Sequence, residues 1–179
     1  MYFELKENRP HGTPEHPFSL YHIKNVPHAF QIPVHWHDEL EIIYVKSGSV
    51  HVTISGEHYI GNTGDAFVVS PGSLHFMGSH TGDVDYYTFL FPLEFVSFQM
   101  NDLSEQMLMA PLKSGRMLFQ IQIGKSIEDL CEHLLVLYAG EGDVRNPIRT
   151  TVPKDSAKRI SFVAKQMETK MILLEFLQR

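Results

Sequence analysis

The sequence predicts a mainly β domain, built as a sandwich or small barrel, with two α-helices at its C-terminal end. Between residues 34 and 91, short runs rich in β-branched and aromatic residues alternate with turns that contain glycine or proline, as in antiparallel sheets. After residue 125, apolar residues recur at spacings of three and four, which indicates amphipathic helices. A chain of 179 residues is long enough to bury one core without cross-links.

Composition argues against several classes of protein. The formal net charge is −6, whereas DNA-binding proteins usually carry a basic surface that neutralises phosphates. No apolar run reaches the roughly 18 residues of a membrane span, and residues 1–10 do not resemble a signal peptide. The single cysteine, Cys131, is expected to be buried and cannot form an internal disulfide, so a cytoplasmic location is the simplest assumption.

Residues 1–29 are predicted to form an extended N-terminal arm. Prolines at positions 10, 14, 17 and 27 interrupt this segment and prevent a long helix. One short strand is expected around Phe18 to Ile23. The histidines of the arm fit no pattern and are expected on the surface or in loops: His11, His16, His22 and His28.

Residues 30–125 are expected to form the β domain. The segments ELEIIYVKSG and SVHVTISG are predicted as two successive strands, the first of which stops at Ser47-Gly48. Further strands are predicted within residues 57–65, 66–77 and 84–91. The segments EFVSFQM and RMLFQIQIG, on either side of an irregular piece, could both be strands.

Residues 126–179 are predicted to be helical. Ser126 and Asp129 resemble a capping box at the start of the first helix, and Gly140 is a plausible C-cap. The apolar stripe of this helix consists of Ile127, Leu130, Leu134 and Leu137.

The second helix is expected to run from about Asp155 to the end of the chain. Its stripe consists of Ile160, Val163, Met167, Met171 and Leu174. This stripe could pack on its own domain, or it could form a helix–helix interface with a second copy of the chain. The chain stops inside this helix without a C-cap, which suggests that a longer protein was cut here.

The densest chemistry lies in HWHDELE, residues 35–41. On one strand, residues of equal parity point to the same face, so His35, His37 and Glu41 could face one cavity. A neighbouring strand could bring His75 to the same place. Two or three imidazoles and a carboxylate are ligands for zinc, iron, nickel or manganese, but the same residues also fit a polar cavity lining or a hydrogen-bonded cluster.

Aromatic residues nearby are weaker candidates for ligand binding. Trp36 has the opposite parity to the histidines, so packing on the outer face competes with lining the pocket, and Tyr44 has the same ambiguity. Tyr86 and Tyr87 are consecutive, so only one of them can face a cavity. The remaining histidines of the β domain, His51 and His58, are expected to face solvent on a hairpin.

These residues resemble the two cupin motifs. The first motif corresponds to His35-Trp36-His37, Glu41 and Gly48, and the second corresponds to Gly64, Pro71, Gly72 and His75. The chain departs from the pattern at two positions, because Ala29 replaces an expected glycine and Ser79 replaces an expected asparagine. Pro71 and Gly72 are also adjacent instead of separated by one residue.

Over roughly residues 30–91, the chain is similar to the N-terminal sensor domain of AraC/XylS-type transcription regulators. The resemblance implies a cupin-like jelly-roll barrel that binds a small effector, with His35, His37, Glu41 and His75 near its cavity. It implies that the C-terminal helices pair two subunits. It also implies a DNA-binding domain with two helix-turn-helix units, which this chain does not contain.

The resulting expectation is a sensing and dimerisation domain with an arm (1–29), a barrel (30–125) and a helical linker segment (126–179). The effector would be a sugar or another polar metabolite, and DNA would be bound only through the missing domain. No catalytic residue is assigned, and a divalent zinc, nickel, iron or manganese ion at the four ligand-type residues stays open. The alternative is a small metal-dependent cupin enzyme, such as a dioxygenase or isomerase.

Overall fold

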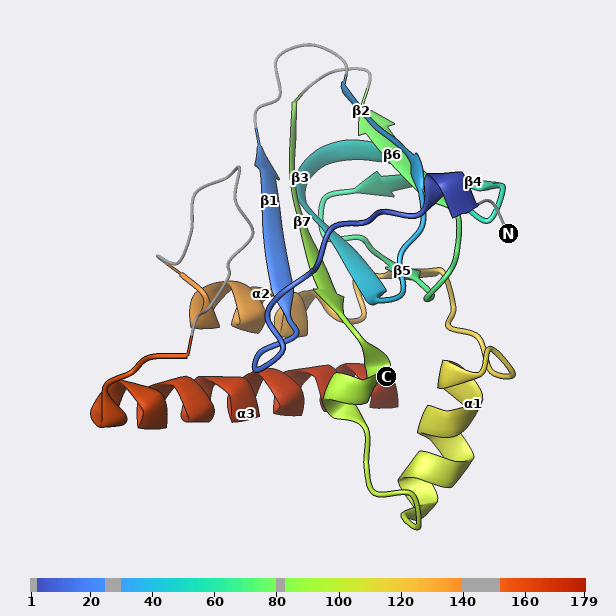
Figure 1. Ribbon diagram of the computed structural model, residues 1–179. Helices are drawn as coiled ribbons and strands as arrows, with labels where there is room; N and C mark the ends of the chain where they lie inside the picture. Colours follow the sequence, from blue (N-terminus) through green and yellow to red (C-terminus); the bar gives the residue numbers. More distant parts are fainter. Residues whose placement is uncertain (1–2, 25–29, 80–82, 140–151) are drawn as a thin grey trace.

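The computed structural model describes residues 3–24, 30–79, 83–139 and 152–179. Its architecture confirms the predicted mainly β fold with two C-terminal helices (Figure 1). The strands are β1 (Ser19–Lys24), β2 (Phe30–His35), β3 (Leu40–Ile54), β4 (Glu57–Asn62), β5 (Ala66–Val69), β6 (His75–Ser79), β7 (Val84–Phe91) and β8 (Gln122–Gly124). The helices are α1 (Ala110–Lys113), α2 (Glu128–Leu137) and α3 (Ser156–Gln178), with short helical turns η1 (Phe3–Leu5), η2 (Leu93–Val96) and η3 (Glu105–Met109).

The long strand β3 belongs to both halves of the barrel. Its first part pairs with β7 and β5, and its second part pairs with β4 and β6. The prediction of two strands that stop at Ser47-Gly48 is therefore wrong. The register shifts between Val45 and Ser47, and Gly48 has a φ of +84°, so the chain bends there and continues. A Cβ on Gly48 would lie 2.0 Å from the carbonyl oxygen of Asp83, so the bend requires glycine.

Two apolar clusters lie on opposite faces of the β3–β7 sheet. The interior of the barrel is filled by Ile43, Val45, Val50, Val52, Ile54, Phe67, Val69, Met77, Val84 and Tyr86. On the other face, residues of β3, β5 and β7 pack against α2 and α3, which lie below the barrel in Figure 1. Alternation along each strand thus supplies two cores and leaves one end of the barrel for polar residues.

The first C-terminal helix forms as predicted but begins differently. The residue preceding α2 is Ile127, and no side chain caps the helix. The capping box of Ser126 and Asp129 is therefore wrong, because the Ser126 hydroxyl donates to the carbonyl oxygen of Ile123 instead. Cys131 is buried, as expected. The proposed C-cap, Gly140, lies outside the described residues.

The predicted stripe of α3 does not pack on its own domain. Asp155 caps this helix by accepting a hydrogen bond from the backbone N–H of Lys158. The buried face of α3 is made by Thr169, Ile172, Leu173 and Phe176. Four of the five stripe residues are instead exposed: Ile160 by 75%, Val163 by 50%, Met167 by 60% and Met171 by 68%.

The segment between β7 and α2 is more helical than its sequence suggested. The expected strand within residues 94–100 is wrong, because Pro92 starts the turn η2 and Leu93, Phe95 and Val96 bury their side chains at helical spacing. Within residues 116–124 only the short strand β8 forms. Among the described residues, no helix is long and apolar enough to cross a membrane.

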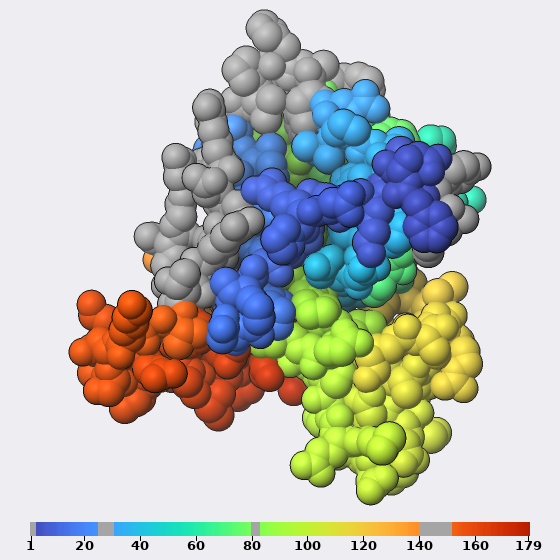
Figure 2. All heavy atoms as spheres, in the orientation of Figure 1, coloured from blue at the N-terminus to red at the C-terminus, as the bar shows by residue number. Residues whose placement is uncertain are grey.

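The N-terminal arm leads into the barrel. The strand expected around Phe18 to Ile23 is confirmed as β1, which pairs with β7. Before it, the arm lies across the strands of the barrel (Figure 2). His11 and His16 lie in the irregular part of the arm, which agrees with the predicted loop position, but both are buried rather than at the surface. Their ring nitrogens meet the hydroxyls of Tyr21 and Tyr138 at 2.8 Å, which replaces the water that burial removes.

The remaining histidines have different outcomes. His51 and His58 are exposed on the β3–β4 hairpin, as expected. His22 lies on β1, where its ring stacks on Tyr87 with 4.1 Å between centroids. The position of His28 lies outside the described residues.

Candidate functional site

Three histidines meet at one end of the barrel, but they come from different elements. His35 ends β2, His75 begins β6, and these two residues are paired in the β2–β6 ladder. His37 lies in the turn between β2 and β3, and Glu41 follows on β3. The parity argument for a single strand is therefore wrong, because the chain leaves the strand after His35. The turn and the ladder bring the four side chains together instead.

The histidine rings form a compact group. The ring centroids of His35 and His75 are 4.2 Å apart, those of His37 and His75 5.0 Å, and those of His35 and His37 5.9 Å. One ring nitrogen from each histidine lies within 4.8 Å of the other two. Three imidazole nitrogens at this separation are a suitable donor set for a first-row divalent metal.

Backbone carbonyls orient all three rings. The Nδ1 atoms contact the carbonyl oxygens of Pro33 at 2.8 Å, Glu39 at 3.1 Å and Ser73 at 2.9 Å, for His35, His37 and His75 respectively. A neutral imidazole that donates from Nδ1 has its lone pair on Nε2. The main chain therefore favours the tautomer that presents Nε2 as a ligand atom, which is the usual outer support of a metal-bound histidine.

Glu41 lies against two of these histidines. Its Oε2 atom is 3.1 Å from Nε2 of His37 and 3.1 Å from Nε2 of His75, but only the His37 contact has hydrogen-bond geometry. Burial opposes the charged form of Glu41, but the two histidines outweigh burial and hold the pKa of its carboxyl far below the usual range. The cluster thus contains a buried, ionised carboxylate, and Nε2 of His75 has no hydrogen-bond partner among the described residues.

The pKa values of His37 and His35 shift in opposite directions. Burial lowers the pKa of His37, but the hydrogen bond and charge of Glu41 raise it, and the net direction is upward. For His35, burial comes first and the nearby His75 adds to it, so the pKa of His35 falls. His35 is therefore held neutral, as a metal ligand or a hydrogen-bonding group requires.

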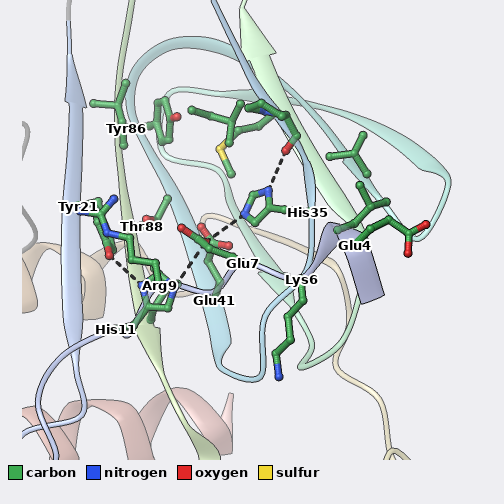
Figure 3. Close-up of a pocket in the computed structure, with 17 residues that line it drawn as sticks. Glu4, Lys6, Glu7, Arg9, His11, Tyr21, His35, Glu41, Tyr86 and Thr88 are labelled. Carbon is green, nitrogen blue, oxygen red and sulfur yellow. Dashed lines mark hydrogen bonds and ion pairs between the residues drawn. The ribbon is translucent and has the colours of Figure 1, made fainter. Parts of the chain in front are cut away.

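A cavity of about 490 Å³ opens beside the cluster. His35 and Glu41 line it, while His37 and His75 are buried and do not. The wall combines barrel residues with residues of the N-terminal arm, as Figure 3 shows. Of the two consecutive tyrosines, Tyr86 faces the cavity.

Several residues of this cavity were not anticipated from the sequence. The polar ones are Glu4, Lys6, Glu7, Arg9, His11, Tyr21 and Thr88. The arm residues have no periodic pattern, so no signal in the sequence identified them. Alternation along β1 and β7 could have identified Tyr21 and Thr88, since each strand presents every second side chain to the interior.

Two of the predicted site residues lie away from this cavity. Trp36 is 3% exposed, and the amine of Lys6 lies 5.0 Å from the centroid of its ring. Tyr44 points toward α2, where its hydroxyl donates to Glu132 Oε1 at 2.6 Å. Neither residue lines the cavity with His35 and Glu41, so this geometry does not support a ligand-binding role for them.

Comparison with known families gives one match that covers most of the chain. A family model described as an AraC-like ligand binding domain matches residues 11–148. The matched region includes the three clustered histidines, Glu41 and both sheets. A search of curated proteins finds no match.

Solved structures with similar regions include several cupins. A conserved protein of unknown function from Streptococcus pyogenes is 16% identical over 42% of this chain and 62% of that chain, with a TM-score of 0.35. An RmlC-like cupin from Shewanella frigidimarina is 29% identical over 40% and 66%, with a TM-score of 0.36. A salicylate 1,2-dioxygenase from Pseudoaminobacter salicylatoxidans is 17% identical over 50% and 24%, with a TM-score of 0.37. This chain spans less than two thirds of the length of each of them.

Proposed function

Because this chain belongs to the family of AraC-like ligand-binding domains, we propose that it is the effector-sensing domain of a transcription regulator. In this proposal a small molecule binds in the barrel cavity, and the bound state is passed to a DNA-binding domain elsewhere in the regulator. An effector can shift such a regulator only if it binds one of two states more tightly. The regulator would act in the cytoplasm.

The observation that carries this proposal is the shared wall of the cavity. Its volume of about 490 Å³ suits a small metabolite. Residues 4–11 of the arm form part of the wall, and the interior of the barrel forms the rest. A ligand in this space contacts both segments at once, so its presence can change how firmly the arm is held.

Thermal unfolding of the purified domain tests effector binding. A library of sugars, organic acids and other polar metabolites is screened for compounds that raise the melting temperature, because a ligand stabilises the state it binds. A true effector should lose its effect in Thr88→Phe, which fills the cavity from β7, and keep it in His58→Phe on the exposed hairpin. A library without any stabilising compound would count against the proposal.

We further propose that two copies of the chain pair through α3. The residues Ile160, Val163, Met167 and Met171 leave an apolar stripe in contact with water. In a single copy this exposure is unfavourable, whereas burial against the same stripe of a second copy removes apolar surface from water. Such pairing would place two DNA-binding domains side by side.

A metal-dependent enzyme is the second candidate, favoured by the orientation of the histidines. His35, His37 and His75 would hold the ion through Nε2, with Glu41 beside them as an additional oxygen donor. A divalent zinc, nickel, iron or manganese ion would supply Lewis acidity there. Elemental analysis of protein purified without chelator decides this point, since an enzyme of this kind requires a stoichiometric ion.

A further inference from the structure

We propose that the effector carries a carboxylate, and that this carboxylate displaces Glu7 of the arm from His11 and pairs with Arg9. This inference rests on the proposed function, because it assigns the chemical class of the ligand for the same cavity. The two residues that would receive the ligand, His11 and Arg9, are called the carboxylate subsite below. Both line the cavity.

The carboxylate subsite already holds a carboxylate of the chain itself. Glu7 Oε2 lies 3.5 Å from His11 Nε2 and 3.7 Å from His35 Nε2, as Figure 3 shows. The Glu7 side chain is 29% exposed, so water only partly solvates it. The place beside His11 Nε2 therefore already accommodates a carboxylate group.

Glu7 fills the carboxylate subsite incompletely. Its distance of 3.5 Å to His11 Nε2 exceeds the roughly 2.7–2.9 Å of a charge-assisted hydrogen bond. His11 is 7% exposed, yet its Nε2 atom has no hydrogen-bond partner within the described part of the chain. A buried polar atom without a partner is costly, so a ligand that satisfies it gains affinity.

Arg9 adds a positive charge that no carboxylate among the described residues pairs with. Its guanidinium lies 5.4 Å from the centroid of the Tyr21 ring, at the wall of the cavity. Guanidinium groups recognise carboxylates through two parallel N–H donors. An untethered carboxylate can approach Arg9 and His11 together, whereas the backbone of the arm fixes the position of Glu7.

The arm is held weakly enough to be displaced. Its contacts with the β2–β3 turn include a bridge between Lys6 and Trp36, with backbone hydrogen bonds of 2.9 Å and 3.1 Å, and the amine of Lys6 over the Trp36 ring. An ion pair between Lys6 and Asp38 adds little, since Asp38 is 69% exposed. Displacement of Glu7 therefore favours release of residues 5–7 from the β2–β3 turn, while Arg9 and His11 hold the ligand.

The apolar residues of the cavity wall favour a ligand with an apolar body. Ile23, Ile32, Met77 and Leu90 contribute apolar side chains to the wall. A compact hydrocarbon body beside these side chains gains from burial, while its carboxylate occupies the carboxylate subsite. The geometry thus favours a small monocarboxylate with an apolar body over a sugar.

The chain contains a natural reporter for this displacement. Trp36 is the only tryptophan, it is 3% exposed, and the arm lies against it. Release of the arm should expose Trp36 to water and shift its fluorescence emission to longer wavelength. Butanoate and cyclohexanecarboxylate are titrated into metal-free protein, beside the neutral amides butanamide and cyclohexanecarboxamide at matched ionic strength.

The carboxylates are expected to shift the emission with saturation, and the amides are not. In Glu7→Gln the competing charge is gone. If Glu7 occupies the subsite in about nine molecules of ten, the apparent Kd for carboxylates falls about tenfold in this variant. Glu15→Gln is the matched control, because Glu15 also lies on the arm but is exposed and does not line the cavity. Its Kd should equal that of the wild type.

Equal binding of acids and amides would overturn the inference, and so would equal Kd values for both variants. The inference would also be overturned if neither carboxylate binds to Glu7→Gln. The melting temperature with the metabolite library separates this failure from failure of the proposed function. Stabilisation by neutral sugars alone leaves a sensing domain with another ligand class, whereas no stabilisation by any compound removes both proposals.

Discussion

Single atoms decide what the histidine cluster can bind. Each of His35, His37 and His75 has its Nδ1 atom occupied by a backbone carbonyl oxygen, so Nε2 is directed to the common centre. Nε2 of His75 is buried beside Glu41 and has no hydrogen-bond partner among the described residues. A divalent ion would satisfy that atom and neutralise the carboxylate, so the three histidines and Glu41 could hold such an ion.

At this scale, replacement of one histidine should weaken metal binding strongly. Loss of an outer hydrogen bond to a ligand costs roughly 10–100-fold in affinity, so loss of the ligand in His75→Ala should cost more than about a hundredfold. Competition with a chromogenic chelator measures zinc affinity directly. His58→Ala on the exposed hairpin is the control and should bind zinc as the wild type does. Equal affinity in both variants would show that the three histidines do not form the site.

Among the elements, β3 determines the shape of the barrel. Its bend at Gly48 allows one strand to serve both halves, and it carries Glu41 at one end and the hairpin at the other. Ser47-Gly48 predicts the end of a strand, whereas β3 bends there and continues. A glycine with positive φ marks a bulge inside a strand as readily as the end of one, and only tertiary pairing distinguishes the two.

Gly48→Ala should therefore destabilise the domain severely. The new Cβ would meet a backbone oxygen at 2.0 Å and would also require a positive φ, which together should cost about 3 kcal/mol or more. Gly56→Ala is matched in conformation, with a φ of +89°, but no atom lies within 4 Å of its Cβ. It should cost only about 1–2 kcal/mol. Urea unfolding compares the two, and equal losses would contradict the role of the Gly48 bend.

The exposed apolar stripe of α3 is the proposed dimer interface. Met167→Glu and Met171→Glu place charges on the exposed stripe, so both should shift the chain toward the monomer in sedimentation velocity. Met107→Glu is the control, because Met107 is also exposed, by 71%, but lies on η3. An unchanged mass in all three variants would show that α3 is not the dimer interface.

For the whole molecule, the sequence predicted those features that depend on local patterns. Strand alternation and helical periodicity predict the fold class, and the motif predicts that His35, His37, Glu41 and His75 lie close together. The way they meet was not predictable, because it depends on the turn after β2 and on the β2–β6 ladder. The part of the arm that lines the cavity was not predictable, because Glu7 and His11 have no periodic neighbours. Their positions depend on backbone contacts with Trp36 and on the hydroxyl of Tyr21, which are distant in sequence.

The β3 bend, the β2–β6 ladder and the N-terminal arm together form the cavity and its surroundings. The β3 bend closes the barrel, the ladder between β2 and β6 builds the histidine cluster, and the arm completes the cavity beside it. On the other face of the sheet, α2 and α3 pack against β3, β5 and β7. A ligand in the cavity would be separated from the helices by a single sheet, which would give a short physical route from the proposed effector to the proposed dimer interface on α3.

The central claim, that an effector binds in this cavity, is tested most directly by methyl NMR of methionine-labelled protein. The compound that raises the melting temperature most is titrated while the Met77 and Met100 methyl signals are followed. Met77 lines the cavity, whereas Met100 is 83% exposed outside it. The account predicts a saturable shift of the Met77 signal and an unchanged Met100 signal. A saturating shift elsewhere, with the Met77 signal unmoved, would contradict it.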